Sequence, residues 1–120
     1  YTQSSKKEGN GMKLIIAIVQ DEDSARLVRG LMDAGYGVTK LATTGGFLRS
    51  GNTTLLVGVE DERFDGAMEV IEKICKSRKQ IATSPSPMSG ATGVYVPYPI
   101  EVVVGGATVF VLNVEKFVKI

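Results

Sequence analysis

Hydrophobic positions divide the chain into apolar runs of strand length and segments with helical spacing. The run LIIAIV, Leu14 to Val19, is typical of a strand buried on both faces, or on one face and at an interface. The next apolar residues recur at helical spacing: Leu27, Val28, Leu31 and Met32. This spacing predicts an amphipathic helix over 23–34, with Gly35 as the residue that ends it.

A second helix is predicted from a later apolar stripe. Its members are Phe64, Ala67, Met68, Ile71, Ile74 and Cys75. Asp61 is its predicted cap, as Asp21, Asp23 and Ser24 are N-cap candidates for the first helix. Because Asp21, Glu22 and Asp23 are consecutive, they cannot all converge on one metal ion, and we interpret them as capping and solvated charges.

Between the helices, β-like runs occupy Tyr36–Thr44 and Thr53–Glu60, joined by a loop at Gly45–Asn52. After the second helix, residues 80–98 contain three prolines and two glycines, which predicts a long loop without secondary structure.

The end of the chain is predicted to hold two more strands, Ile100–Val104 and Ala107–Val114. Gly105-Gly106 between them is typical of a two-residue hairpin turn.

The order strand–helix–strand–strand–helix–strand, with one further strand, is the ferredoxin-like α+β pattern. It predicts an antiparallel sheet with both helices on one face, and oligomerisation is the ordinary way to cover the other face. Met12 starts the patterned region, so we assign one domain to 12–120. Residues 1–11 are polar and aperiodic, and we interpret them as a cloning remnant or a disordered tail.

Composition narrows the function. The 120 residues contain no histidine and only one cysteine, which removes the commonest general base, an internal disulfide and a multi-cysteine metal site. Without a histidine to activate it, Cys75 is expected to be a core residue. Residues 12–120 carry 12 basic and 12 acidic side chains, whereas a nucleic-acid binder should be basic. The chain shows no signal peptide or membrane span, so cytoplasm is expected.

The Gly45–Asn52 segment carries the strongest binding chemistry. Adjacent glycines let a backbone approach a ligand and present N–H groups to an anion. Phe47 can stack on a nucleobase, and the Asn52 amide has the donor and acceptor that read an adenine edge. Alternatively, this is a glycine-rich hairpin whose Phe47 packs into the core.

Four stretches together resemble the PII-like cyclic di-AMP receptors of Gram-positive bacteria. They are MKLIIAIVQDEDS, TKLATTGGFLRSGNTT, SPSPM and VPYPIEVVVGGATVFVL, and the resemblance extends over Met12–Ile120. It implies a ferredoxin-like, PII-like fold with an extra C-terminal strand, assembled as a homotrimer. It also implies a signal-transduction role without catalysis or metal, one cyclic di-AMP in each cleft between subunits, an enlarged loop at 80–98 and a shortened one at 45–52.

The resemblance also implies the ligand-binding residues. These are Thr39, Gly46, Phe47, Leu48, Asn52, Gly58 and Phe110, with Phe47 against one adenine and Asn52 and Gly58 near the other. Where the family often has Asn and Arg before this threonine, the chain has Gly35 and Gly37, and Lys119 replaces a glutamine of some members. The alternatives are a nitrogen-PII-type regulator of ATP and 2-oxoglutarate and a trimeric interaction module without a ligand. The downstream protein is unknown.

Overall fold

The computed structural model describes residues 11–46, 49–89 and 94–120. Its elements, in chain order, are β1 (Met12–Gln20), α1 (Asp21–Asp33), β2 (Val38–Gly46), β3 (Arg49–Glu60), the 3-10 turn η2 (Asp61–Arg63), α2 (Phe64–Cys75), β4 (Arg78–Ser89), β5 (Val94–Val104) and β6 (Ala107–Val114).

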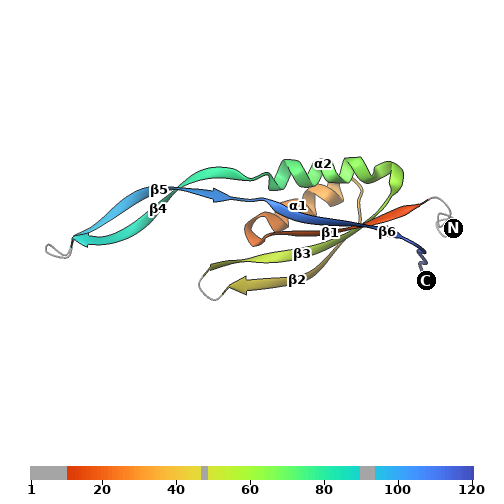
Figure 1. Cartoon of the computed structure of the whole chain (residues 1–120), viewed down its shortest axis with the longest axis horizontal. Helices are drawn as coiled ribbons and strands as arrows, with labels where there is room; N and C mark the ends of the chain where they lie inside the picture. Colours follow the sequence, from red (N-terminus) through yellow and green to blue (C-terminus); the bar gives the residue numbers. More distant parts are fainter. Residues whose placement is uncertain (1–10, 47–48, 90–93) are drawn as a thin grey trace.

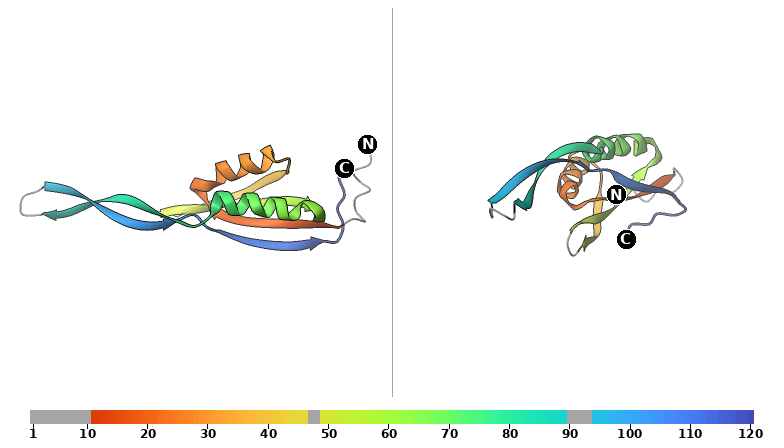
Figure 2. Two further views of the ribbon diagram at one scale, coloured as in Figure 1. Left: turned by 90° about the horizontal axis from the view of Figure 1, so that it is seen from above. Right: turned by 60° about the vertical axis from the view of Figure 1, so that its left-hand side comes forward.

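The main sheet has four strands in the order β2-β3-β1-β6, all antiparallel to their neighbours. Both helices cover one face of it (Figure 1), and the two further views agree (Figure 2). This confirms the ferredoxin-like α+β class. The last strand of the chain completes the four-stranded sheet, and the strands beyond the ferredoxin-like pattern form a separate hairpin, β4–β5, inserted before it.

Strand alternation places the core between the sheet and the helices. Along β1, Ile15, Ala17 and Val19 are buried against the helices, as are alternate residues of β3. The helices contribute most of the predicted stripes: Leu27 and Leu31 from α1, and Ala67, Ile71 and Cys75 from α2, are buried. Met32, which the spacing placed in the first stripe, is 59% exposed and lies outside the core. The two helices approach closely at Gly30 of α1, where an added Cβ would lie only 2.6 Å from Cδ1 of Ile74 in α2.

Residues 80–98 do not form the predicted loop. Except for residues 90–93, which lie outside the described residues, they belong to β4 and β5, which pair from Arg78↔Val104 outward. The hairpin projects from the body, and the molecule extends 72 Å along its longest axis (Figure 1). The prolines suggested a loop, but Pro85 is paired with Pro97, and Pro99 follows two residues later. The pairs Thr83↔Pro99 and Pro85↔Pro97 belong to one alternate set of the ladder. In an antiparallel ladder one alternate set of pairs exchanges no hydrogen bonds, which is where a strand accommodates prolines that have no N–H to donate.

The predicted hairpin turn at Gly105-Gly106 is also wrong. β5 pairs with β4 and β6 pairs with β1, so the two glycines join two different sheets. Both have left-handed backbone conformations, with φ of 88° and 93°. The Gly105 N–H donates to Gln20 Oε1 at 2.8 Å, and the Gly106 N–H donates to the Cys75 carbonyl. The glycines therefore form a corner that is tied to β1 and to the end of α2.

The loop between β2 and β3 is shorter than the predicted Gly45–Asn52. β2 continues to Gly46 and β3 begins at Arg49, and these two residues are paired. Phe47 and Leu48 between them lie outside the described residues. The β2–β3 ladder therefore continues through threonine and glycine residues up to Gly46 and Arg49. The glycine-rich composition of this stretch had predicted a longer loop instead.

The helix starts differ from the predicted caps. α1 begins at Asp21 rather than 23, its N-cap is Gln20, and no side chain caps it. Asp61 starts η2 instead of capping α2, which begins after Arg63 without a side-chain cap. The first turn of α1 still carries three acidic residues, Asp21, Glu22 and Asp23, and the helix dipole favours negative charge there.

The predicted end of α1 is confirmed. Gly35 has φ 92°, its N–H bonds to the Met32 carbonyl, and the Tyr36 N–H bonds to the Leu31 carbonyl. This pair of hydrogen bonds is the Schellman motif, and it satisfies carbonyls that the helix leaves unpaired.

The corner predicts a difference between Gly105→Ala and Gly106→Ala. Both place alanine at a left-handed φ, which costs about 1–2 kcal/mol of stability. At Gly105 a Cβ would also lie 2.6 Å from Arg78 Nη1 and 2.8 Å from the Lys76 carbonyl oxygen, whereas the space at Gly106 is open. Urea unfolding at fixed protein concentration should therefore show the larger loss for Gly105→Ala. Equal losses would mean that the corner is not tightly packed.

Candidate functional site

The sheet face opposite the helices carries most of the predicted ligand residues. Strand register aligns Thr39 with Leu56, Leu56 with Ile16, and Ile16 with Phe110. Directly opposed residues point to the same face, and Ile16 alternates with the buried core residues of β1. Thr39 and Phe110 are thus at the two ends of one row across the helix-free face, which we call the open face.

Two further predicted residues lie on the same face. Gly58 is opposite Leu14, and Asn52 is opposite both Gln20 and Thr44. Gly58 is exposed, and a Cβ at that position would contact nothing within 4 Å. Gly46 closes the β2–β3 ladder opposite Arg49, so it lies at the strand end next to the tip.

These residues do not converge within one chain. Thr39 and Phe110 are separated by three strand spacings, or about 15 Å. Asn52 and Gly58 are six residues apart on β3, or about 20 Å. The open face therefore holds parts of a site spread over its width and length, and two hollows lie at its ends.

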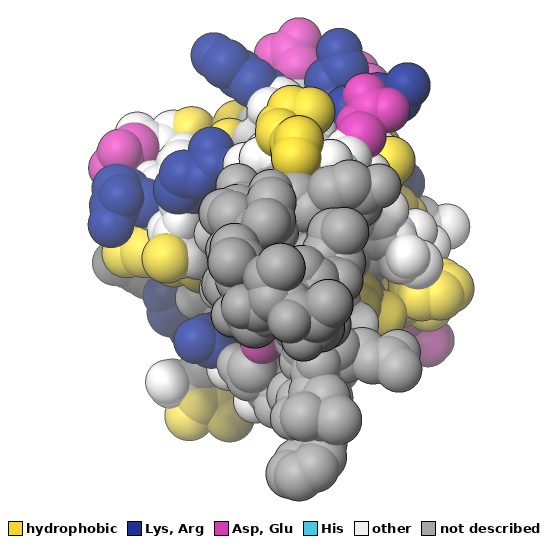
Figure 3. All heavy atoms as spheres, turned by 90° about the vertical axis from the view of Figure 1, so that its left-hand side faces the viewer, with side chains coloured by type: hydrophobic (Ala, Val, Ile, Leu, Met, Phe, Trp, Pro, Cys, Tyr) yellow, Lys and Arg dark blue, Asp and Glu magenta, His cyan; other side chains and the backbone are white. Residues whose placement is uncertain are grey.

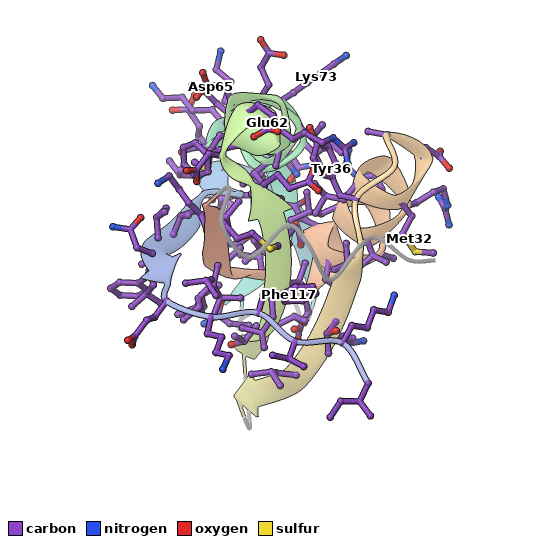
Figure 4. All side chains as sticks on the ribbon, turned by 90° about the vertical axis from the view of Figure 1, so that its right-hand side faces the viewer. Met32, Tyr36, Glu62, Asp65, Lys73 and Phe117 are labelled. Atoms are coloured by element: carbon purple, nitrogen blue, oxygen red, sulfur yellow. The ribbon has the colours of Figure 1, made fainter. Side chains whose placement is uncertain are left out.

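One hollow, of about 200 Å³, contains Gly58 and Gly37 together with Phe117 and Lys119 of the C-terminal segment. In Figure 4 the C-terminal segment, with Phe117, crosses in front of β3 and β2, and Tyr36 lies nearer the helices. Arg63 stacks over the Tyr36 ring at 4.3 Å and donates to the Ala34 and Gly35 carbonyls. Lys119 therefore brings a cation to the Gly58 end of the open face, and sequence reasoning had noted it only as a departure from the family pattern.

The other hollow, of about 280 Å³, lies at the corner between the sheet and the hairpin. It is lined by Ile18, Gln20, Asn52, Gly105, Gly106, Ala107 and Thr108. Among these, only Asn52 was predicted as a ligand residue. No sequence pattern singled out Gln20, because its contact with Gly105 joins positions 85 residues apart.

The open face is strongly apolar at the β6 edge. Phe110 is 54% exposed and Leu112 is 47% exposed, and both lie beside partly buried β1 residues of the same face. An exposed phenylalanine can stack on a nucleobase or pack against another subunit. This edge therefore offers an apolar contact surface next to the polar hollows.

The described residues provide little for catalysis. Cys75 is 2% exposed, and burial followed by the charge of Asp23 raises the pKa of its thiol to about 11. It is a core residue, as expected, and an unreactive thiol at neutral pH. Among residues 11–46, 49–89 and 94–120, no group of three metal-ligating side chains is found.

The interpretation of Asp23 as a solvated charge is wrong. Its side chain is 1% exposed, and its Oδ1 accepts hydrogen bonds from Arg26 at 2.9 Å and from Arg78 at 3.0 Å. Arg78 is the first residue of β4, so this ion pair between a partly exposed arginine and a buried carboxylate attaches the hairpin to α1. From the sequence alone, three consecutive acidic residues do not show which one points into the protein. Because α1 begins at Asp21, the third residue, Asp23, is the one that is buried.

Charged side chains on the surface are mixed in sign. In Figure 3, which looks along the hairpin toward the body, Lys and Arg side chains lie beside Asp and Glu side chains around α2 at the top. This agrees with the balanced charge of residues 12–120. No helix in the described part of the chain is long and apolar enough to cross a membrane.

The four-stranded antiparallel sheet with both helices on one face and an apolar face left open defines a ferredoxin-like α+β domain. The chain belongs to the cyclic-di-AMP receptor family, whose model matches residues 12–120. It is also similar to a functionally unknown protein from Pediococcus pentosaceus ATCC 25745, whose crystal structure is known. The two share 43% sequence identity with a TM-score of 0.73, and the match covers 92% of this chain and 99% of the other.

Proposed function

We propose that the protein is a cytoplasmic receptor that binds cyclic di-AMP in clefts between the subunits of a homotrimer and responds with a change in loop conformation. Family membership supports the ligand. The observation that carries the site is the distribution of Thr39, Asn52, Gly58 and Phe110 over one open face. They are too far apart to enclose a ligand in one chain, so a neighbouring copy is needed to complete each cleft.

The proposed roles follow from the chemistry of the ligand, which has two purine bases and two anionic phosphates. Thr39 donates its hydroxyl, and the Gly46 amide with Leu48 shapes the tip of the site. Phe47 stacks on one adenine, while Asn52 and Gly58 meet the other base or its ribose. Phe110 lines the apolar wall. None of these contacts needs histidine or a metal ion, because no bond of the ligand is broken.

Ligand identity is tested by calorimetry with cyclic di-AMP, cyclic di-GMP, ATP and AMP. We expect cyclic di-AMP to bind most tightly and to stabilise the folded state by about 2.7 kcal/mol when its free concentration is 100 times Kd. Thr39→Val and Asn52→Leu should weaken binding, because each removes polar atoms proposed to contact the ligand. Clear heat with ATP and none with cyclic di-AMP would instead indicate a nitrogen-PII-type regulator.

Phe47→Ala tests the stacking role of a residue that lies outside the described part of the chain. If Phe47 stacks on adenine, the substitution should cost about 1–3 kcal/mol of binding free energy, or roughly 5- to 150-fold in Kd. Stability should change little, because a tip residue contributes little to the core. Phe64→Ala, in the helix stripe, is the matched control and should lower stability instead. Unchanged affinity with a large loss of stability would favour the core-packed interpretation of Phe47.

Assembly is tested by light scattering at micromolar concentration. We expect a trimer, because burying the apolar open face of three copies around one axis removes it from water. Phe110→Asp should dissociate the trimer and abolish ligand binding together, whereas Val103→Asp, on the hairpin, should leave the trimer intact. A wild-type monomer would exclude clefts between subunits.

A further inference from the structure

The chain leaves the main sheet at one defined point. β1 pairs with β6 from Met12↔Val114 to Val19↔Ala107. One position further along, Gln20 still pairs with Asn52 of β3, but the backbone on the β6 side turns away through Gly106 and Gly105 into the hairpin. The Gln20 side chain fills this interruption of the ladder, since its Oε1 accepts the Gly105 N–H at 2.8 Å.

Besides the backbone hydrogen bond from Gly106 to Cys75, two side-chain contacts hold the base of the hairpin from opposite sides. On the helix side, Arg78 of β4 is paired with the buried Asp23. On the open-face side, Gly105 at the end of β5 is held by Gln20. Because Arg78 and Val104 are directly opposed, both contacts act on the same end of the ribbon. Only the Gln20 contact borders the hollow that contains Asn52.

We propose that Gln20 is the positioning residue that links ligand occupancy at Asn52 to the hairpin β4–β5. This inference rests on the proposed function and specifies how its site would be regulated. Gln20 and Asn52 are opposed on neighbouring strands, with Cβ atoms about 5 Å apart, and both line the same hollow, so a ligand in that hollow can contact both side chains. The oxygen of that amide is engaged by Gly105. Its NH₂ group is the remaining donor, and it suits a phosphate oxygen or a purine nitrogen.

The physical link is the rigidity of the amide. A ligand acceptor that binds the Gln20 NH₂ restricts the side chain, and this strengthens the hydrogen bond from its oxygen to Gly105. The corner can respond because its two glycines are in left-handed conformations and the hairpin pairs with no strand of the main sheet in the described part of the chain. The ligand shifts the hairpin only as far as it binds the held arrangement more tightly.

Three variants of the full chain separate the parts of this link. Gln20→Met keeps the length of the side chain and removes both the acceptor and the donor. Gln20→Glu keeps an acceptor for Gly105 but removes the donor. Gln80→Met makes the same change as the first variant at an exposed glutamine within the hairpin and serves as the control. Each is titrated with cyclic di-AMP by calorimetry, and the Gly105 amide exchange is measured with and without saturating ligand.

In wild type and Gln80→Met, we expect saturating ligand to slow Gly105 exchange. Gln20→Met should exchange roughly fivefold faster without ligand, as expected for a lost hydrogen bond, and should not slow when ligand is added. Gln20→Glu should exchange like wild type without ligand, yet also fail to slow. That split marks a role beyond structure, because the Gly105 hydrogen bond is intact in this variant.

Two results would overturn the link alone: unchanged Gly105 exchange in ligand-free Gln20→Met, or normal ligand-dependent slowing in Gln20→Glu at saturation. Absence of calorimetric heat with wild type would reject the proposed function itself, and the link with it. The same titration therefore tells the two failures apart.

Discussion

The rest of the structure depends on β1 being apolar on both faces. One set of alternate residues, Ile15, Ala17 and Val19, seals the core under the helices, while Leu14, Ile16 and Ile18 form the middle of the open face. A strand of this kind must occupy the interior of a sheet, which is why β3 and β6 pair on either side of it. It also leaves a second apolar surface that one chain cannot bury alone. The sheet order, and the assembly proposed above, thus both follow from one sequence feature.

Sequence patterns predicted correctly those features that depend on neighbouring residues in the chain. Periodicity predicted both helices and their buried stripes, and the Gly35 stop was confirmed, because these features depend on residues within a few positions of one another. The βαββαβ order followed from counting such segments. The family resemblance added the class of ligand, which no pattern of charge or spacing alone identified.

The errors arose where partners are distant in the chain. Whether a proline interrupts a strand depends on whether its position would donate to a neighbouring strand, so Pro85, Pro87 and Pro97 suggested a loop where the structure has paired strands. Gly105-Gly106 has the composition of a hairpin turn, but β6 gains more by pairing with the apolar β1 than with β5. Asp23 was assigned to solvent because its partner Arg78 is 55 residues away. For the site, the shared face of four predicted residues became visible only through register, and Gln20 had no sequence signal.

The hairpin β4–β5 begins beside the body at the pair Arg78↔Val104, where Arg78 contacts Asp23 and the adjoining Gly105 contacts Gln20. The two backbones enter and leave about 5 Å apart. Beyond this pair, the described residues 79–89 and 94–103 form strand pairs only within the ribbon. Residues can therefore be added to or removed from both strands at the far end without shifting the register of the main sheet or the helix packing. Hairpin length is thus a property that evolution, or an engineer, can vary separately from core stability, and with it the reach of the protein toward other molecules.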